Sequence, residues 1–310
     1  MKGDVDMSRI AFLFPGQGAQ YAGMGKDFYE QFDICRGVFA EAQEASGMDL
    51  TQLCFEENDL LNITEYTQVA LLTTEVAILR VIERLGIKPA VAAGLSLGEY
   101  ASLAAGKVMS DGELFQIVRK RGLYMQEACP EGGAMVAVLG LDAETIEKIC
   151  REQNGQVYVA NYNCPGQLVI TGKADAVAAT GARLKEAGAK GIVPLKVSGP
   201  FHSPLLNAAS EKLAAALLDV DVYTPDIPYI TNVTANYVKD AECIKELLAK
   251  QVVSSVRWQQ SVERMIADGI DTFIEIGPGK SLSGFMKKIN REVRIINVGS
   301  VDDLSKLETL

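Results

Sequence analysis

Residues 89–100 read Pro89-Ala90-Val91-Ala92-Ala93-Gly94-Leu95-Ser96-Leu97-Gly98-Glu99-Tyr100. The first six form a short apolar run, which predicts a buried strand that ends at Gly94. The residues that follow predict a turn into a helix of small residues. Gly94, Ser96 and Gly98 thus form G-x-S-x-G where a strand meets a helix, the context in which this pattern predicts a serine nucleophile. An ordinary turn with a capping serine is the alternative, and the five-residue pattern alone does not exclude it.

The rest of the chain alternates between strand and helix patterns. Strands are predicted at residues 10–14, 89–94, 227–230, 272–276 and 293–298. Helices are predicted at residues 67–85, 111–126, 204–218, 241–253 and 258–268, with Asp111 as an N-cap. The alternation favours a mostly parallel sheet covered on both faces. We therefore expect an α/β fold with an α/β-hydrolase-like parallel-sheet core.

Residues 133–198 have a different pattern. Strands are predicted at residues 134–139, 157–160, 167–170 and 192–197, and helices at 142–153 and 174–187. The order β-α-β-β-α-β is ferredoxin-like. We therefore expect a discontinuous large α/β catalytic domain (residues 7–130 and 199–310) and an inserted ferredoxin-like small subdomain (residues 131–198).

Composition and charge exclude several classes of protein. The chain has 310 residues, 48% hydrophobic and 23% charged, as in ordinary globular proteins. It carries 30 Lys and Arg against 40 Asp and Glu, a net charge of −10. This acidity argues against nucleic-acid binding, because the phosphate backbone attracts basic surfaces. An anionic substrate would need a local positive site.

The distribution of apolar residues and cysteines bears on location. No stretch reaches the roughly 18 to 20 apolar residues of a membrane helix. Asp4 and Asp6 argue against a signal peptide at the N-terminus. The six cysteines include no C-x-x-C and fit no zinc or disulfide spacing. We therefore expect free thiols and a cytoplasmic protein that does not bind membranes.

A nucleophilic serine needs a base, because a free hydroxyl is a poor nucleophile near neutral pH. His202 is the only histidine and has the most suitable pKa. It lies in a constrained loop, Gly199-Pro200-Phe201-His202-Ser203-Pro204. Nothing in the spacing identifies an acidic partner for it, although Asp221 and Asp226 follow at plausible distances. A single histidine also rules out multi-histidine metal sites, so we expect no metal.

Arg121 has two interpretations that composition cannot separate. It lies in Arg119-Lys120-Arg121-Gly122, near the end of a predicted helix. An exposed basic helix end suits the helix dipole. The alternative is a buried guanidinium that binds a substrate carboxylate through two hydrogen bonds.

Several motifs together resemble one family, the malonyl-CoA:acyl carrier protein transacylases. The motifs are Phe14-Pro15-Gly16-Gln17-Gly18-Ala19-Gln20, Gly94 to Tyr100, Arg121-Gly122 with Met125-Gln126, Asn161-Tyr162-Asn163 with Pro165-Gly166-Gln167, Gly199 to Ser203, and Glu275-Ile276-Gly277-Pro278-Gly279. The resemblance extends from about residue 9 to residue 300. It is far more specific than G-x-S-x-G alone.

The resemblance implies a role for each matching residue. Ser96 would carry the malonyl group as an ester, with His202 as its base and later as the acid. Family members orient this histidine through a main-chain carbonyl, here that of Gln251. The backbone N–H groups of Gln17 and Leu97 would form the oxyanion hole.

The resemblance also implies the substrates. Arg121 would pair with the malonyl carboxylate, and Asn161 and Phe201 would contact the substrate. The bulk of Phe201 resembles that of malonyl-selective members. The donor would be malonyl-CoA and the acceptor the phosphopantetheine thiol of acyl carrier protein, in fatty acid synthesis, with no cofactor.

The sequence departs from the family at two positions. Leu95 stands where many members have histidine, which implies a local packing change. Val69 stands where proline is common, which puts only a helix start in doubt. A serine esterase or thioesterase, with water as the acceptor, is the alternative activity.

An acidic carrier would need a basic docking surface on this acidic chain. The candidates are Lys185, Lys190, Lys196, Lys280, Lys287, Lys288 and Arg291. An ordinary solvated surface is the alternative for any one of them. Residues 277–280 predict a strand-to-helix turn, and a phosphate site at the helix start is the less favoured interpretation.

Overall fold

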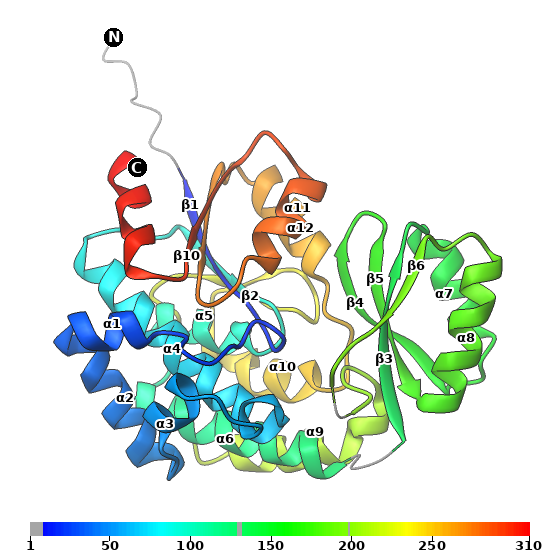
Figure 1. Cartoon of the computed structure of the whole chain (residues 1–310), viewed down its shortest axis with the longest axis horizontal. Coiled ribbons are helices and arrows are strands. Elements are labelled where there is room, and N and C mark those ends of the chain that lie inside the picture. Colours follow the sequence, from blue (N-terminus) through cyan, green and yellow to red (C-terminus); the bar gives the residue numbers. More distant parts are fainter. Residues whose placement is uncertain (1–8, 129–131, 198) are drawn as a thin grey trace.

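The structure is a computed structural model that describes residues 9–128, 132–197 and 199–310. The expected domain boundaries at residues 130 and 131 and at residue 198, together with Cys129 and residues 1–6, lie outside the described residues. Figure 1 shows a larger part of the molecule around one sheet and a smaller part, in green, around another. Among the described helices, none combines the length and apolar character that a membrane crossing requires.

The larger part is built on a six-stranded sheet of order β10-β9-β1-β2-β7-β8. Its strands are β1 (Ile10–Phe14), β2 (Val91–Gly94), β7 (Tyr229–Ile230), β8 (Tyr237–Val238), β9 (Thr272–Ile276) and β10 (Arg294–Val298). Neighbouring strands are parallel except for β7 and β8. The predicted parallel-sheet core is therefore confirmed, and one short antiparallel strand extends its edge.

Helices cover both faces of this sheet, because its strands are buried on both sides. Phe12 and Phe14 of β1 point to one face and Ala11 and Leu13 to the other. The hydrophobic core on the first side of the sheet includes residues of α1 (Lys26–Gln31), α2 (Asp33–Ser46), α3 (Leu50–Phe55), α4 (Thr64–Arg84), α5 (Gly98–Ala105), α6 (Asp111–Ala128), α9 (Asn207–Leu217) and α10 (Ile244–Gln251). Of these, α4 and α5 contact the sheet, and α2 and α6 pack on α4. The second face packs against α11 (Trp258–Ala267) and α12 (Ser281–Ile289).

The smaller part contains a four-stranded sheet of order β4-β5-β3-β6 in which all neighbours are antiparallel. Its elements are β3 (Gly133–Leu139), α7 (Ala143–Arg151), β4 (Val157–Cys164), β5 (Gln167–Lys173), α8 (Ala174–Glu186) and β6 (Gly191–Pro194). The helices cover one face, where Ile146 and Leu184 pack on Val138. The other face turns toward the larger part, as Figure 1 shows.

Some predicted element ends are wrong, for local reasons. Helix α4 begins at Thr64, so Val69 is buried in its interior and not at a helix start. Asp111 is not the N-cap of α6, because Ser110 and Glu113 form reciprocal hydrogen bonds there. The helices predicted at 204–218 and 241–253 start as 3₁₀ turns, η2 (Pro204–Leu206) and η3 (Ala241–Cys243). Strand β6 ends at Pro194 and not at residue 197, because the chain turns tightly where Val197 N–H donates to Leu195 O at 3.0 Å.

The turn after β2 closes against the loop after β1 because three glycines allow backbone contact. A Cβ on Gly94 would lie 1.8 Å from the carbonyl carbon of Gly98. A Cβ on Gly98 would lie 2.2 Å from Phe14 O, and one on Gly16 would lie 2.4 Å from Leu95 O. Any side chain at these positions would push the two segments apart. The glycines of G-x-S-x-G are therefore required by close packing.

We expect Gly94→Ala to lower the free energy of unfolding by more than about 3 kcal/mol, because the atoms that its methyl group would strike are backbone atoms. Denaturant unfolding measures this. The matched control is Gly37→Ala in α2, at an exposed site with no heavy atom within 4 Å. It should raise stability by about 0.5 to 1 kcal/mol. Equal stability of the two variants would contradict the packing argument.

Candidate active site

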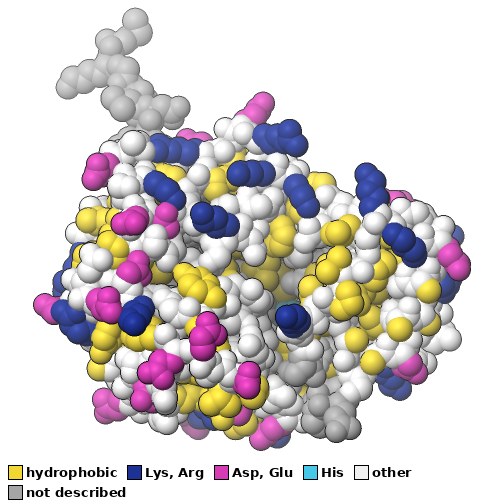
Figure 2. All heavy atoms as spheres, viewed as in Figure 1, with side chains coloured by type: hydrophobic (Ala, Val, Ile, Leu, Met, Phe, Trp, Pro, Cys, Tyr) yellow, Lys and Arg dark blue, Asp and Glu magenta, His cyan; other side chains and the backbone are white. Residues whose placement is uncertain are grey.

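A cavity of about 240 Å³ lies at the carboxyl ends of β1 and β2 and faces the smaller sheet. This is where ligands bind in open parallel sheets. Its lining includes Ser96 and Arg121 on one side and Met135, Ala137 and Val169 on the other. Figure 2 shows the hollow between the two parts, with apolar side chains on its walls. Among the described residues that line it, Arg121 is the only Lys or Arg and there is no Asp or Glu.

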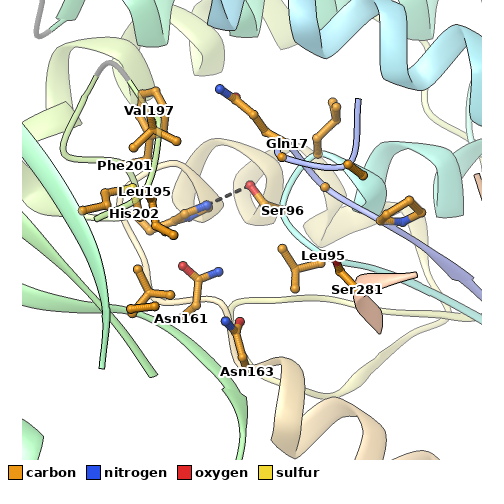
Figure 3. A pocket seen from close by; sticks show the side chains of 18 of the residues that line it. Gln17, Leu95, Ser96, Asn161, Asn163, Leu195, Val197, Phe201, His202 and Ser281 are labelled. Carbon is orange, nitrogen blue, oxygen red and sulfur yellow. Dashed lines mark hydrogen bonds between the residues drawn. The ribbon is translucent and has the colours of Figure 1, made fainter. Parts of the chain in front are cut away.

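Ser96 and His202 meet in this cavity, although 106 positions separate them in the chain. The distance from Ser96 Oγ to His202 Nε2 is 2.8 Å, drawn as the dashed line in Figure 3. Both residues have positive φ, 56° for Ser96 and 60° for His202. Residues other than glycine rarely adopt such values, and those that do concentrate at functional sites. The predicted pairing of the serine with the only imidazole is therefore present in the geometry.

The other ring nitrogen of His202 faces main-chain carbonyls. Nδ1 lies 3.0 Å from Gln251 O and 3.2 Å from Ser254 O. A carbonyl accepts a hydrogen bond and cannot donate one, so Nδ1 carries the proton and Nε2 is free to accept that of Ser96. Asp221 and Asp226 are exposed, and Asp226 pairs with Lys107 at 3.1 Å. Neither acid is a partner of His202, and the carbonyl of Gln251 lies where the family resemblance placed it.

His202 is in its neutral form near neutral pH, the form that can accept a proton. Burial lowers its pKa to about 4, and the charge of Arg121 contributes in the same direction. The hydrogen bonds to the two carbonyls act in the opposite direction. The imidazole is therefore uncharged at pH 7 and able to accept a proton.

Two backbone N–H groups of cavity-lining residues have no hydrogen-bond partner among the described residues. Gln17 follows β1 and Leu97 follows Ser96, and both line the cavity. Neither N–H donates to another atom of the described residues. The N–H of Ser96 itself is occupied, because it donates to Asn232 Oδ1 at 2.6 Å. The geometry thus leaves two donors available for an oxyanion near Ser96 Oγ.

Arg121 is 1% exposed, so the interpretation as an exposed helix end is wrong. It donates to Gln68 Oε1 at 2.6 Å, to Gln251 Oε1 at 3.0 Å and to Ser96 Oγ at 3.3 Å. All three acceptors are neutral, and none of the ion pairs found in the described parts of the chain includes Arg121. Its Nε is buried with no hydrogen-bond partner there. Burial lowers its pKa, so an anionic ligand would stabilise the charged form.

The other predicted side chains also line the cavity. Phe201 is buried beside His202, and Figure 3 shows it grouped with Leu195 and Val197. Asn161 lies below the Ser96–His202 pair in the same view. Leu95, which stands where histidine is common, lines the cavity next to Gly16.

Sequence reasoning missed four residues around this site: Gln68, Glu99, Asn232 and Ser254. Gln68 is one of several buried polar residues of α4, and the sequence does not single it out from the others. Asn232 follows β7, and its side chain donates to Gly94 O at 2.7 Å and accepts from Ser96 N. No local pattern marks Asn232, because its role depends on contacts across the fold.

The remaining candidates lie on the surface. All seven basic residues that are candidates for carrier docking are exposed: Lys185, Lys190, Lys196, Lys280, Lys287, Lys288 and Arg291. The turn at residues 277–280 leads into α12, whose first N–H groups are already satisfied by Glu275. A phosphate there would meet a carboxylate, so the turn interpretation holds. Over the described residues, no cluster of His, Cys, Asp and Glu could hold a metal ion.

Comparison with known proteins gives a consistent result. The model of the acyl transferase domain matches residues 11–301. Malonyl CoA-acyl carrier protein transacylase of Bacillus subtilis is 46% identical over 303 residues, 96% of each chain. The crystal structure of malonyl CoA-acyl carrier protein transacylase from Clostridium perfringens aligns with a TM-score of 0.94 at 42% identity, over 97% of this chain and 96% of that one.

A malonyl-transacylase solved in complex with a type II PKS acyl-carrier protein aligns with a TM-score of 0.95 at 39% identity. The alignment covers 98% of this chain and 100% of that one. These matches confirm the resemblance inferred from the motifs, and the chain belongs to the acyl transferase domain family.

Proposed function

We propose that this protein transfers the malonyl group from malonyl-CoA to the phosphopantetheine thiol of acyl carrier protein, through a malonyl ester of Ser96. The observation that carries the proposal is Arg121, a buried cation beside Ser96 whose hydrogen-bond acceptors in the described part of the chain are all neutral. A buried charge without a carboxylate partner is costly, and a bound anion removes that cost. Malonyl differs from acetyl by one carboxylate, so a guanidinium at this position selects for it.

In the first half-reaction, His202 Nε2 takes the proton of Ser96 as Oγ attacks the thioester carbonyl. The N–H groups of Gln17 and Leu97 stabilise the oxyanion of the tetrahedral intermediate. As the C–S bond breaks, protonated His202 gives its proton to the leaving thiolate of CoA. The products are free CoA and a malonyl ester of Ser96.

The second half-reaction reverses these steps with a new thiol. His202 takes the proton of the carrier thiol, whose sulfur attacks the ester carbonyl. The same N–H groups stabilise the second oxyanion. His202 then returns the proton to Ser96 Oγ as the C–O bond breaks, and the malonyl thioester leaves on the carrier.

The ester must survive until a carrier arrives. We infer that Arg121 holds the free carboxylate, which keeps the acyl group in place and water poorly placed for attack. The bulky side chain of Phe201 narrows the cavity beside His202, so an acyl group with a methyl branch has little room there. Asn161 also lines the cavity and offers an amide for a polar group of the substrate.

Several broader expectations belong to the same proposal. No cofactor is needed, since the steps use only serine, imidazole and thiol chemistry. The carrier would dock on some of the seven exposed basic residues. The Cys residues that the structure describes are free thiols, which supports a reducing compartment such as the cytoplasm.

We also propose names for the two parts of the fold. Residues 7–130 and 199–310 form an α/β-hydrolase-like catalytic domain, supported by the strand-turn-helix at Ser96. Residues 131–198 form a ferredoxin-like subdomain, supported by the strand order β4-β5-β3-β6.

Intact-protein mass spectrometry tests the activity directly. On exposure to malonyl-CoA, the protein should gain one malonyl group, and Ser96→Ala should gain none. The adduct should be lost on addition of holo acyl carrier protein, with the malonyl group recovered on the carrier. Steady release of CoA without a carrier would instead identify a thioesterase.

Arg121→Ala should reduce the preference for malonyl-CoA over acetyl-CoA, measured as the ratio of kcat/KM values. The loss should be about 10²-fold, because a pair of charge-assisted hydrogen bonds exists only with malonyl. Arg119→Ala is the matched control, since Arg119 pairs with Glu65 and is absent from the cavity lining. It should leave the ratio unchanged. A full malonyl preference in Arg121→Ala would refute this role.

The rate of serine acylation should be constant from pH 8 to about pH 5 and fall as His202 gains a proton near its pKa of about 4. The rate falls toward low pH because only the neutral imidazole accepts the serine proton. Rapid quench followed by mass measurement gives the rate, with circular dichroism as a check on folding. A half-maximal rate at pH 6.5 or above would show that burial does not lower this pKa.

A further inference from the structure

Glu99 is a fully buried carboxylate that the proposed reaction does not use. It is the second residue of α5 and lies three residues after Ser96. Its Oε2 accepts hydrogen bonds from Gln251 Nε2 at 2.6 Å and from Asn232 N at 3.0 Å. Its Oε1 is buried and has no partner in the described chain. One oxygen atom therefore joins α10 and the loop after β7.

The contact with Gln251 fixes the orientation of that side chain. Gln251 Nε2 donates both to Glu99 and, at 2.9 Å, to Ser96 O, while its Oε1 accepts from Arg121. Only one of the two amide orientations satisfies all three contacts. The main-chain carbonyl of the same residue accepts from His202 Nδ1. The residue that orients the base is thus itself held by Glu99.

The contact with Asn232 leads back to the serine turn. Glu99 accepts from the backbone N–H of Asn232. The Asn232 side chain accepts from Ser96 N at 2.6 Å and donates to Gly94 O at 2.7 Å. Ser96 is held in a positive-φ conformation, which persists only when its surroundings impose it. The two hydrogen bonds of Glu99 thus lead through Gln251 to His202 and through Asn232 to Ser96, the two residues that the reaction needs.

We propose that Glu99 is a positioning residue whose Oε2 holds Gln251 and Asn232, so that His202 keeps its proton on Nδ1 and Ser96 keeps its turn. The inference deepens the proposed function and rests on it only where acylation is measured. The role belongs to the position of the oxygen and not to its charge. Glu99 forms no ion pair with Arg121 within the described structure, and burial raises its pKa to about 7.

Two conservative variants separate position from charge. Glu99→Gln loses the charge but keeps an oxygen where Oε2 lies, with its NH₂ group in the place of the unpartnered Oε1. Glu99→Asp keeps the charge but withdraws the oxygen by one methylene. If the position of the oxygen matters, Glu99→Gln should keep a higher rate of acylation than Glu99→Asp, and Glu99→Ala should have the lowest rate.

The single histidine makes the test direct, because all imidazole ¹⁵N signals come from His202. Protein labelled with ¹⁵N-histidine should show the Nδ1–H tautomer at pH 7 without substrate. Glu99→Gln should keep these shifts, while Glu99→Asp and Glu99→Ala should move them toward a mixture of tautomers. The rate of acylation by Glu99→Gln should stay within about 3-fold of that of the unchanged protein, and the rate for Glu99→Ala should fall at least about 10²-fold. The loss should appear in kcat more than in KM, because catalysis needs the correct tautomer.

Glu75→Ala is the matched control, since it removes an equally buried carboxyl group that lacks a hydrogen-bond partner among the described residues. It should leave the imidazole shifts unchanged. Unchanged shifts in Glu99→Ala, or a ranking of Asp above Gln, would overturn the proposal. If Glu99→Ala does not fold, the Gln and Asp variants decide. If the shifts move as expected but no malonyl adduct forms, the proposed function fails and the positioning role stands.

Discussion

The contact between Ser96 Oγ and His202 Nε2 is the interaction on which the site depends. It brings together the turn after β2, which precedes the strands of the smaller sheet in the sequence, and the loop before η2, which follows them. Both residues adopt a positive φ, so each is held by its surroundings and not by its own preference. Glycines make the serine turn sterically feasible, and main-chain carbonyls orient the histidine in place of a carboxylate.

Charge and burial give His202 and Arg121 separate roles, one as the base and the other in substrate binding. The cavity holds one permanent cation and, among the described lining residues, no acid. The same guanidinium helps to keep His202 neutral, and it forms no ion pair within the described residues that a substrate carboxylate would have to replace. An acidic partner beside His202 would compete for Arg121, which gives a physical reason for orienting the imidazole through carbonyls. Overall acidity is thus compatible with an anionic substrate, since the positive site is local and desolvated.

Much of the fold could be predicted from the sequence because its signals are local. Apolar runs that end in glycine marked the central strands, and the strand-turn-helix around Ser96 marked the site. The errors lie at element ends, where single hydrogen bonds decide: Ser110 caps α6 in place of Asp111, and the bond from Val197 N–H to Leu195 O turns the chain away after β6. For Arg121 the sequence left two interpretations open, because burial is a property of the packed structure. Asn232 and Glu99 could not be assigned roles, since their partners are far away in the chain.

The most direct test of the account is a crystal structure of the protein after exposure to malonyl-CoA. The account predicts an ester on Ser96 Oγ, its carbonyl oxygen between the N–H groups of Gln17 and Leu97, and its carboxylate on the guanidinium of Arg121. An acyl group attached elsewhere, or a carboxylate directed to solvent away from Arg121, would contradict it.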